Sequence, residues 1–181
     1  EWIFLDYACI TTGIIDIPMY PINTADSVEF ILNNSEAKAI AVSNKFQLNK
    51  ILKIQDNLKY LKYIIIFNEK DKDESISNLY SLSDIIKNGE KLYSENPNFV
   101  KEKISTITEN DIATIIYTSG TTGEPKGVVL THKNIISNVN ATLQALYITQ
   151  QDKILSFLPL CHIYERSTGY YACWGAGVEY Y

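Results

Sequence analysis

The sequence predicts an α/β fold in which a parallel sheet carries helices on both faces. Three short apolar runs have the length and the β-branched content of buried strands: "KAIAVS" (38–43), "KYIIIF" (62–67) and "DIATIIYTS" (111–119). Longer stretches with apolar residues at helical spacing separate them. Continuous apolar strands that alternate with helices are typical of parallel sheets covered on both faces. We therefore expect parallel-sheet layers with helices on each side.

The first part of the chain predicts two helices joined by an extended segment. "WIFLDYACITTGI" (2–14) has a helical spacing of apolar residues that ends near Gly13. The next stretch, "IDIPMYPINT", carries two prolines and is therefore expected to be extended or turning. Thr24 is a suitable N-cap for a helix over 25–34 that has an apolar face.

The middle of the chain alternates between well patterned and weakly patterned segments. After the first strand, an amphipathic helix is expected over 44–58, capped by Asn44. Residues 68–111 carry the weakest pattern and begin with a charged surface loop, "NEKDKDESISN". A helix over 82–93 is expected within them, and Pro97 interrupts the segment after it.

The last part of the chain predicts one further strand and two helices. A helix is expected over 131–146, after a segment rich in glycine and hydroxyl residues. "KILSFLPL" (153–160) is expected to form a fourth strand that ends at Pro159. Residues 163–176 predict one more helix, with glycines at its end.

The composition describes an ordinary globular protein and excludes several classes. Of the 181 residues, 46% are apolar and 20% are charged. The net charge of −5 argues against general affinity for nucleic acids, which requires basic clusters. The apolar runs are far shorter than the roughly 20 residues of a membrane-spanning helix. The three cysteines lack the close spacing of a zinc or redox site, so reduced thiols in a cytosolic protein are expected: Cys9, Cys161 and Cys173.

The segment "YTSGTTGEPKG" (117–127) looks like a phosphate-binding loop but fits neither common pattern. The Walker A motif requires glycine before its lysine and a hydroxyl residue after it, whereas Lys126 lies between Pro125 and Gly127. The Rossmann motif GxGxxG is absent, because Gly120 and Gly123 are three residues apart and no glycine stands at 118. Both of these nucleotide-binding patterns are therefore excluded.

The chemistry of an anion site is nevertheless present in this segment. Three glycines allow positive φ and a close approach of backbone N–H groups to an anion: Gly120, Gly123 and Gly127. Four hydroxyls add neutral donors: Thr118, Ser119, Thr121 and Thr122. Lys126 adds a positive charge suited to phosphate oxygens. The alternative is a polar, glycine-rich hairpin without a ligand, which the Pro-Lys-Gly sequence makes less favourable.

"YTSGTTGEPKGVVLTH" (117–132) closely resembles the signature of the adenylate-forming enzymes, and residues 117–127 match it position by position. In that family the loop holds the phosphates of ATP while a carboxylic acid attacks the α-phosphorus. The resemblance implies that Thr118 helps to hold Mg²⁺ and that Thr118 and Lys126 take part in catalysis. It also implies a set of ATP contacts: Thr118, Ser119, Gly120, Thr121, Thr122, Gly123 and Lys126.

A second block, "FLPLCHIYER" (157–166), resembles the "LPLxHxxER" block of long-chain acyl-CoA synthetases, and the first 44 residues also resemble that branch. The resemblance implies that His162 is a catalytic and substrate-binding residue beside the acyl carboxylate. The alternative is a histidine whose hydrogen bonds are satisfied at a strand end. Glu165 and Arg166 are expected to form a structural ion pair, worth about 0–1 kcal/mol if it lies at the surface, or to start a helix.

Three neighbouring features are expected to be structural. Cys161 is rejected as a nucleophile, because adjacent residues of an extended segment point to opposite faces. His132 is expected to start a helix. Core packing is favoured over an acyl channel for most of the aromatic residues after the second block: Tyr164, Tyr170, Tyr171 and Trp174.

The resemblance as a whole implies an ATP-dependent long-chain fatty acid–CoA ligase that uses ATP, Mg²⁺ and CoA. Residues 1–181 are then expected to be a partial N-terminal AMP-binding domain, truncated at both ends, without the C-terminal lysine-bearing domain and inactive alone. Two alternatives stay open: adenylation of an aryl or amino acid, and a non-catalytic nucleotide-binding fragment. A cytoplasmic location is expected, and the lipid substrate leaves room for peripheral contact with a membrane.

Overall fold

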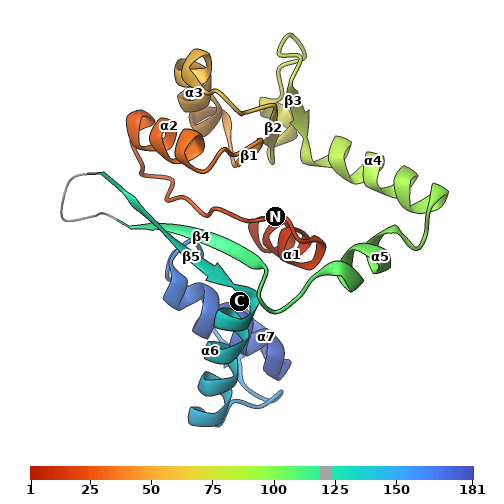
Figure 1. Cartoon of the computed structure of the whole chain (residues 1–181), viewed down its shortest axis with the longest axis vertical. Helices are drawn as coiled ribbons and strands as arrows, with labels where there is room; N and C mark the ends of the chain where they lie inside the picture. Colours follow the sequence, from red (N-terminus) through yellow and green to blue (C-terminus); the bar gives the residue numbers. More distant parts are fainter. Residues whose placement is uncertain (119–123) are drawn as a thin grey trace. The chain divides into compact units, whose positions relative to one another are not determined.

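The computed structural model describes residues 1–118 and 124–181 (Figure 1). The chain divides into two compact units, and each is described by itself. The first unit consists of 21–102 together with Glu1, and the second unit consists of 2–20 and 103–181. Both units combine helices with strands, so the α/β class expected from the sequence is confirmed.

A three-stranded parallel sheet forms the centre of the first unit. Strands β1 (Ala39–Val42), β2 (Tyr63–Ile66) and β3 (Leu79–Ser81) lie in this order, and both neighbouring pairs are parallel. Alternate residues of each strand are buried, which places one row of side chains in the core: Ile40, Val42, Ile64, Ile66, Leu79 and Ser81. The first two strands were predicted. The third was not, because its three residues lie within the charged, weakly patterned segment.

Two capped helices pack on each other in this unit: α2 (Ala25–Asn34) and α3 (Lys45–Ile54). The side chains of Thr24 and Asn44 accept hydrogen bonds from the backbone N–H groups of Ser27 and Gln47, at 3.3 and 3.1 Å. Both predicted N-caps are therefore confirmed. The apolar face of each helix is buried: Val28, Ile31 and Leu32 on α2, and Leu48, Ile51 and Ile54 on α3. Two short 3₁₀ turns follow, η1 (Gln55–Asn57) and η2 (Glu69–Asp71).

The predicted helix after the charged loop is present as α4 (Leu82–Glu95). Ser81 and Asp84 form a reciprocal capping box at its start. A further helix, α5 (Phe99–Thr106), begins two residues after Pro97 and was not predicted. Its sequence "FVKEKIST" is short and polar, so hydrophobic spacing gives little sign of it.

The second unit begins with α1 (Trp2–Thr12), which ends at Gly13 with φ +77° as a left-handed terminator. The following segment runs beside β4 (Ile112–Thr118), where Asp16 forms a parallel bridge with Thr114. On its other edge, β4 pairs antiparallel with β5 (Lys126–Thr131). β4 therefore belongs to a two-stranded antiparallel ribbon and not to the parallel sheet that was expected to contain it. Strand β5 was not predicted.

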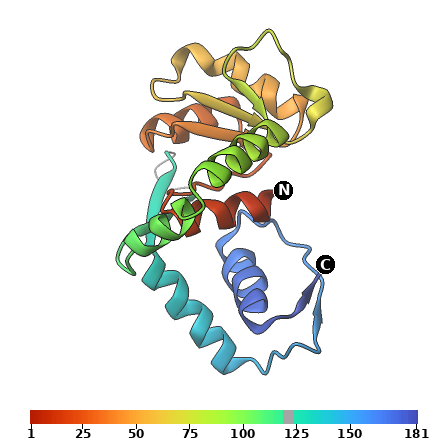
Figure 2. The ribbon, with the colours of Figure 1, turned by 90° about the vertical axis from the view of Figure 1, so that its right-hand side faces the viewer.

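Helix α6 (His132–Ala145) follows β5 directly and is capped by Thr131. It packs against a continuous helix formed by the π-helical segment η3 (Glu165–Tyr171) and by α7 (Ala172–Ala176). Figure 2 shows α6 on one side of this helix and the parallel pair β6 (Lys153–Ile154) and β7 (Glu179–Tyr180) on the other. The predicted helix over 163–176 is therefore confirmed, and Gly177 ends it with φ +73°.

The strand expected over 153–160 is only two residues long. The backbone N–H of His162 donates to the carbonyl of Pro159 at 2.8 Å, so the chain turns where an extended segment was expected. Cys161 and Cys173 are buried, Cys9 is half-buried, and all three thiols are free, as expected. No helix in the described residues is both long and apolar enough to cross a bilayer.

Candidate active site

Thr118 and Lys126 are cross-strand partners at the end of the β4–β5 ribbon. Directly opposite residues of an antiparallel pair carry their side chains on the same face, with Cβ atoms about 5 Å apart. Both side chains are exposed. The threonine and lysine side chains therefore leave the ribbon on the same face, next to residues 119–123 of the segment that resembles the adenylate-forming signature. The other five predicted phosphate contacts lie outside the described residues: Ser119, Gly120, Thr121, Thr122 and Gly123.

Gly127 has a steric role rather than a conformational one. Among the described glycines only Gly13 and Gly177 have positive φ. The expectation that Gly127 uses a positive φ is therefore wrong. A Cβ built on Gly127 would lie 2.9 Å from Cγ2 of Ile115 and 3.1 Å from Cζ of Tyr117. Glycine is needed here because the ring of its cross-strand partner Tyr117 lies over the bare backbone.

His162 lies immediately before the last long helix, and its side chain is exposed. Its Nδ1 accepts a hydrogen bond from the backbone N–H of Tyr164 at 3.2 Å. An acceptor at Nδ1 places the proton of the neutral ring on Nε2. The ring thus caps the helix with one nitrogen and has an N–H donor at the other, which suits contact with a carboxylate or phosphate oxygen.

Cys161 does not have the surroundings of a nucleophile. Its side chain is buried with 6% exposure, and burial raises the pKa of the thiol. A raised pKa lowers the thiolate fraction, and the thiolate is the reactive form. The geometric reason expected from the sequence does not apply, because the segment is a turn and not an extended strand.

Arg166 is the largest buried polar feature of the second unit. Of the two structural roles expected for Glu165 and Arg166, the helix start is confirmed, because both residues open η3. The ion pair between them is wrong, because Arg166 pairs with Asp6 and Asp16. Arg166 is 0% exposed and Asp6 is 2% exposed, so the value expected for a surface pair does not apply. Removing one member of a buried ion pair leaves an uncompensated charge, which costs about 3–5 kcal/mol.

Each guanidinium nitrogen of Arg166 has a partner. Nε donates to the hydroxyl of Tyr171 at 2.9 Å, and Nη1 donates to Oγ1 of Thr114 at 2.8 Å. Nη2 donates to Oδ1 of Asp6, and also to Oδ2 of Asp16 at 2.8 Å. The hydroxyl of Tyr171 donates to the second oxygen of Asp6 at 2.8 Å. We call these five residues the Arg166 cluster.

The sequence did not predict the other members of the Arg166 cluster. The available signal is the acid at position 6 in the otherwise apolar helix "WIFLDYACITT". Burial raises the pKa of Asp16 to about 6, and the nearby Arg166 opposes the shift. Burial also raises the pKa of Cys9, beside these carboxylates, to about 12. The pKa of Tyr171 is raised, again chiefly by burial, so its hydroxyl keeps its proton as a donor.

The carboxylate of Glu165 forms hydrogen bonds that are separate from the Arg166 cluster. It accepts hydrogen bonds from Oγ of Ser156 at 2.7 Å and from the hydroxyl of Tyr180 at 3.1 Å. A Cβ on Gly169 would lie 2.7 Å from the Glu165 carboxyl carbon, so glycine leaves room for the carboxylate. This contact ties the start of η3 to the segment that leads into the "LPLCHIYER" block.

The aromatic residues around this helix divide between core and surface. Tyr170 and Tyr171 are buried, which confirms core packing for them. Trp174 is 45% exposed and forms an edge contact with Tyr7, at 4.7 Å between ring centroids. Tyr164 is 59% exposed. Core packing, expected for most of the four, therefore holds for Tyr170 and Tyr171 and not for Tyr164 and Trp174.

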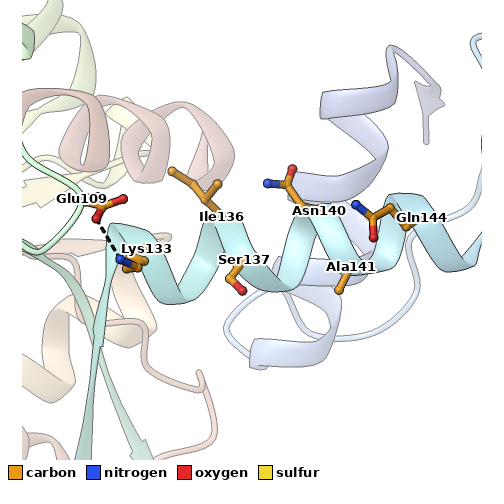
Figure 3. A pocket seen from close by; sticks show the side chains of 7 residues that line it. All are labelled: Glu109, Lys133, Ile136, Ser137, Asn140, Ala141 and Gln144. Carbon is orange, nitrogen blue, oxygen red and sulfur yellow. Dashed lines mark hydrogen bonds and ion pairs between the residues drawn. The ribbon is translucent and has the colours of Figure 1, made fainter.

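Two features near the ribbon lie apart from this site. His132 starts α6 as predicted, and its Nε2 is buried without a hydrogen-bond partner in the described part of the chain. Figure 3 shows an open pocket along one side of α6, where Lys133 and Glu109 form an exposed ion pair at 2.8 Å. None of the predicted site residues lines this pocket.

The metal prediction depends on Thr118. In the described residues, no group of three or more His, Cys, Asp or Glu side chains is placed to hold a metal ion. A threonine hydroxyl is a neutral oxygen ligand of the kind Mg²⁺ accepts when phosphates and water supply the other positions. The exposed Thr118 hydroxyl at the ribbon end fits that role.

Similar curated proteins include long-chain acyl-CoA synthetases. The long-chain-fatty-acid–CoA ligase ACSBG2 of Xenopus laevis is 35% identical over 167 residues, which cover 90% of this chain and 22% of that protein. Long chain acyl-CoA synthetase 6, peroxisomal, of Arabidopsis thaliana is 33% identical over 167 residues, covering 92% and 23%. The chain therefore spans less than a quarter of the length of these two relatives.

Solved structures share the fold. The anthranilate CoA ligase AuaEII, in complex with anthranoyl-AMP, superposes with a TM-score of 0.76 at 20% identity, covering 99% of this chain and 32% of that one. ATP-bound MatB from Rhodopseudomonas palustris superposes with a TM-score of 0.69 at 17% identity, covering 97% and 31%. The family model described as AMP-binding enzyme matches residues 1–181 throughout. This chain accordingly belongs to the family of AMP-binding enzymes.

Proposed function

We propose that this chain supplies the phosphate contacts and one carboxylate contact of an ATP-dependent long-chain fatty acid–CoA ligase. The observation that carries the proposal is the pairing of Thr118 with Lys126 across the mouth of the signature loop. The exposed imidazole of His162 adds an N–H donor for the acid. The names of the curated relatives support a long acyl chain as the substrate.

The proposed reaction has two steps. In the first, a carboxylate oxygen of the fatty acid attacks the α-phosphorus of ATP, and the bond to the β-phosphate oxygen breaks. Pyrophosphate leaves with the electron pair, and an acyl-adenylate remains. In the second, the thiolate of CoA attacks the acyl carbonyl, and AMP leaves to give acyl-CoA. Each step makes one bond and breaks one, so atoms and electrons balance.

The residues of this chain act mainly on the first step. Lys126 neutralises negative charge that builds up on the departing phosphates, and its position opposite Thr118 supports this role. The Nε2–H of His162 donates to an oxygen of the carboxylate or of the α-phosphate, and the hydrogen bond at Nδ1 holds the ring in that orientation. Thr118 would hold Mg²⁺ through its hydroxyl, and the bound ion would supply further neutralisation of phosphate charge.

We also propose that this chain works as one part of a longer enzyme. Its relatives are about four times as long as the matched region, at 22% and 23% coverage. The adenylate-forming resemblance implies that the adenine and ribose contacts, and the catalytic lysine of a small C-terminal domain, lie outside residues 1–181. The separate 181-residue chain is then expected to be inactive.

The main alternative is the activation of a different carboxylic acid. The structural relatives include an anthranilate CoA ligase, although at 20% identity this likeness concerns the fold alone. The block "LPLCHIYER" and the curated relatives favour the long-chain acid. The cytoplasmic location expected from the sequence stays a prediction, and several relatives are named as peroxisomal, among them long chain acyl-CoA synthetase 6.

The test is acid-dependent ATP–pyrophosphate exchange by the complete protein, supplied in turn with palmitate, benzoate, anthranilate and an amino acid. We expect exchange with palmitate and a loss of about 100-fold in Lys126→Ala, since the removal of one charge-stabilising donor costs about 10²–10³ in rate. Lys126→Arg is the matched control that keeps the charge. Exchange with benzoate or an amino acid but not palmitate would establish the alternative acid, and an unaffected Lys126→Ala would remove the assignment of the loop.

A further inference from the structure

The Arg166 cluster joins four segments of the second unit through one buried guanidinium. Asp6 comes from α1, Asp16 from the segment beside β4, Thr114 from β4 itself, and Tyr171 from η3. Arg166 and Thr114 are both 0% exposed. A guanidinium has a rigid, planar set of donors, so these partners are held in fixed directions around it.

Thr114 is the member of the cluster that lies on the same strand as Thr118, one of the proposed phosphate contacts. Its hydroxyl accepts from Nη1 of Arg166 at 2.8 Å and donates to the carbonyl of Asp16 at 2.7 Å. The carbonyl of Asp16 also accepts from the backbone N–H of Ile115 at 3.1 Å. Thr114 and Thr118 lie four residues apart on one strand, so their side chains share a face. The Thr114 hydroxyl thus anchors β4 at a point four residues before Thr118.

The same arginine is tied to His162 through its backbone. The N–H of Arg166 donates to the carbonyl of His162 at 3.0 Å, in the first turn of the helix that the imidazole caps. The cluster thus connects the strand that ends at Thr118 with the helix start that carries His162. Arg166 is hydrogen-bonded to Thr114 and to His162, the strand β4 itself joins Thr114 to Thr118, and all of these residues belong to one compact unit.

We propose that Arg166 is a positioning residue that fixes β4, and with it Thr118, relative to His162. This inference rests on the proposed function, because it assigns the two ends of the path to the phosphates and to the carboxylate. The adenylation step needs both ends at once, since the carboxylate oxygen must lie in line with the α-phosphorus. A displacement of about 1 Å at such a distance from the reacting atoms can cost about 100-fold in rate. The transfer from a finished acyl-adenylate to CoA does not require the carboxylate and the triphosphate to be aligned.

The test compares the two half-reactions in the complete protein. Thr114→Val removes the hydroxyl that links Arg166 to β4 and keeps the side-chain shape, and Thr114→Ser keeps the hydroxyl as the matched control. We expect Thr114→Val to slow palmitate-dependent ATP–pyrophosphate exchange by about 10- to 100-fold. We expect CoA transfer from preformed palmitoyl-adenylate to change less than about twofold, and Thr114→Ser to retain both rates. A loss of folded protein would instead lower both half-reactions by the same factor.

Arg166→Lys is the second variant, because lysine keeps the charge beside both carboxylates but cannot reproduce the four-partner geometry. Selective loss of adenylation in Thr114→Val supports the inference, and Arg166→Lys should show the same selectivity. Equal loss in both half-reactions, or normal adenylation in Thr114→Val, overturns it while leaving the proposed function intact. If the unaltered protein shows no palmitate-dependent exchange, the proposed function itself fails, and the inference fails with it.

Discussion

The ring of Tyr117 lies over the backbone of Gly127, its cross-strand partner in the β4–β5 ribbon. A Cβ at position 127 would lie 3.1 Å from Cζ of that ring and 2.9 Å from Cγ2 of Ile115. Cγ2 of Ile115 is attached directly to Cβ, and the χ1 angle of a β-branched residue is stiff, so this methyl group cannot easily move away. The glycine after Lys126 is thus required by packing within the ribbon.

The first prediction concerns this contact. Gly127→Ala should destabilise the protein by about 1–3 kcal/mol, as expected when an extra carbon is forced into a packed site. Gly89→Ala is the control, because a Cβ there meets nothing within 4 Å and the residue lies inside α4. Replacing a glycine inside a helix should stabilise the protein by about 0.5–1 kcal/mol. Thermal unfolding of the complete protein would measure both, and an unchanged midpoint in Gly127→Ala would contradict the steric account.

The second prediction concerns the hydroxyl of Thr118. Thr118→Val keeps the shape of the side chain and removes the oxygen proposed for Mg²⁺, whereas Thr118→Ser keeps the oxygen. The loss of a contact to a charged group costs about 1.5–3 kcal/mol, or roughly 10- to 100-fold in rate. We expect Thr118→Val to slow ATP–pyrophosphate exchange by this amount and to raise the Mg²⁺ concentration needed for half of the maximal rate. Equal Mg²⁺ dependence in both variants would argue against the metal role.

The fold elements with a strong local signal could be predicted from the sequence. The caps at Thr24 and Asn44, and the apolar faces behind them, depend on residues close together in the chain. Strands β3 and β5 were missed for local reasons. One is three residues long in a charged segment, and the other follows the glycine loop without an apolar alternation. Their partners, and not their own sequence, make them strands.

The candidate site divides in the same way. Thr118, Lys126 and His162 lie in short motifs, and the motifs are visible without a structure. The Arg166 cluster is not visible, because it joins Asp6 and Arg166 across 160 positions and Asp16 and Arg166 across 150. From the sequence, Arg166 was expected to form an ion pair with its chain neighbour Glu165 or to start a helix. In the folded protein the guanidinium is buried. A buried charge is costly unless it is paired, so Arg166 pairs with carboxylates that the fold brings close from distant parts of the sequence.

The third prediction is that the titration of Asp16 makes the free energy of unfolding depend on pH. Its pKa is raised from the ordinary 3.8 to about 6, chiefly by burial, with Arg166 opposing and Asp6 and the nearby Cys9 as its other titratable neighbours. The folded state therefore holds the proton more tightly than the unfolded state. The stabilisation is complete below about pH 4 and is lost as the pH rises through about 6, by up to about 3 kcal/mol at 1.36 kcal/mol for each pKa unit.

Asp16→Asn removes this titration. The stability of the variant relative to the unaltered protein should rise between pH 4 and pH 7. Asp84→Asn is the control: hydrogen bonds from Ser81 and Lys72 lower the pKa of Asp84 to about 2, so its contribution is lost only as the pH falls below about 4. Midpoints of thermal unfolding, measured between pH 4 and pH 7 for the unaltered protein and the two variants, would test this prediction. A constant difference between Asp16→Asn and the unaltered protein would show that Asp16 does not titrate in this window.

The fourth prediction separates the two nitrogens of His162. Asn in its place can offer an oxygen to the backbone N–H of Tyr164, as Nδ1 does at 3.2 Å, but it has no donor at the position of Nε2. His162→Asn should therefore keep the helix cap, while the lost donor slows palmitate-dependent exchange by about 100-fold. His162→Ala should lose the cap as well, at about 1 kcal/mol of stability.

Thermal unfolding and exchange assays on the same two proteins would test this separation. A slow exchange rate together with an unchanged midpoint in His162→Asn would assign the Nε2 donor to the reaction and Nδ1 to the helix. If His162→Asn exchanges at the normal rate, the exposed donor has no part in adenylation. His162 would then be a capping residue whose hydrogen bond to Tyr164 is its whole role.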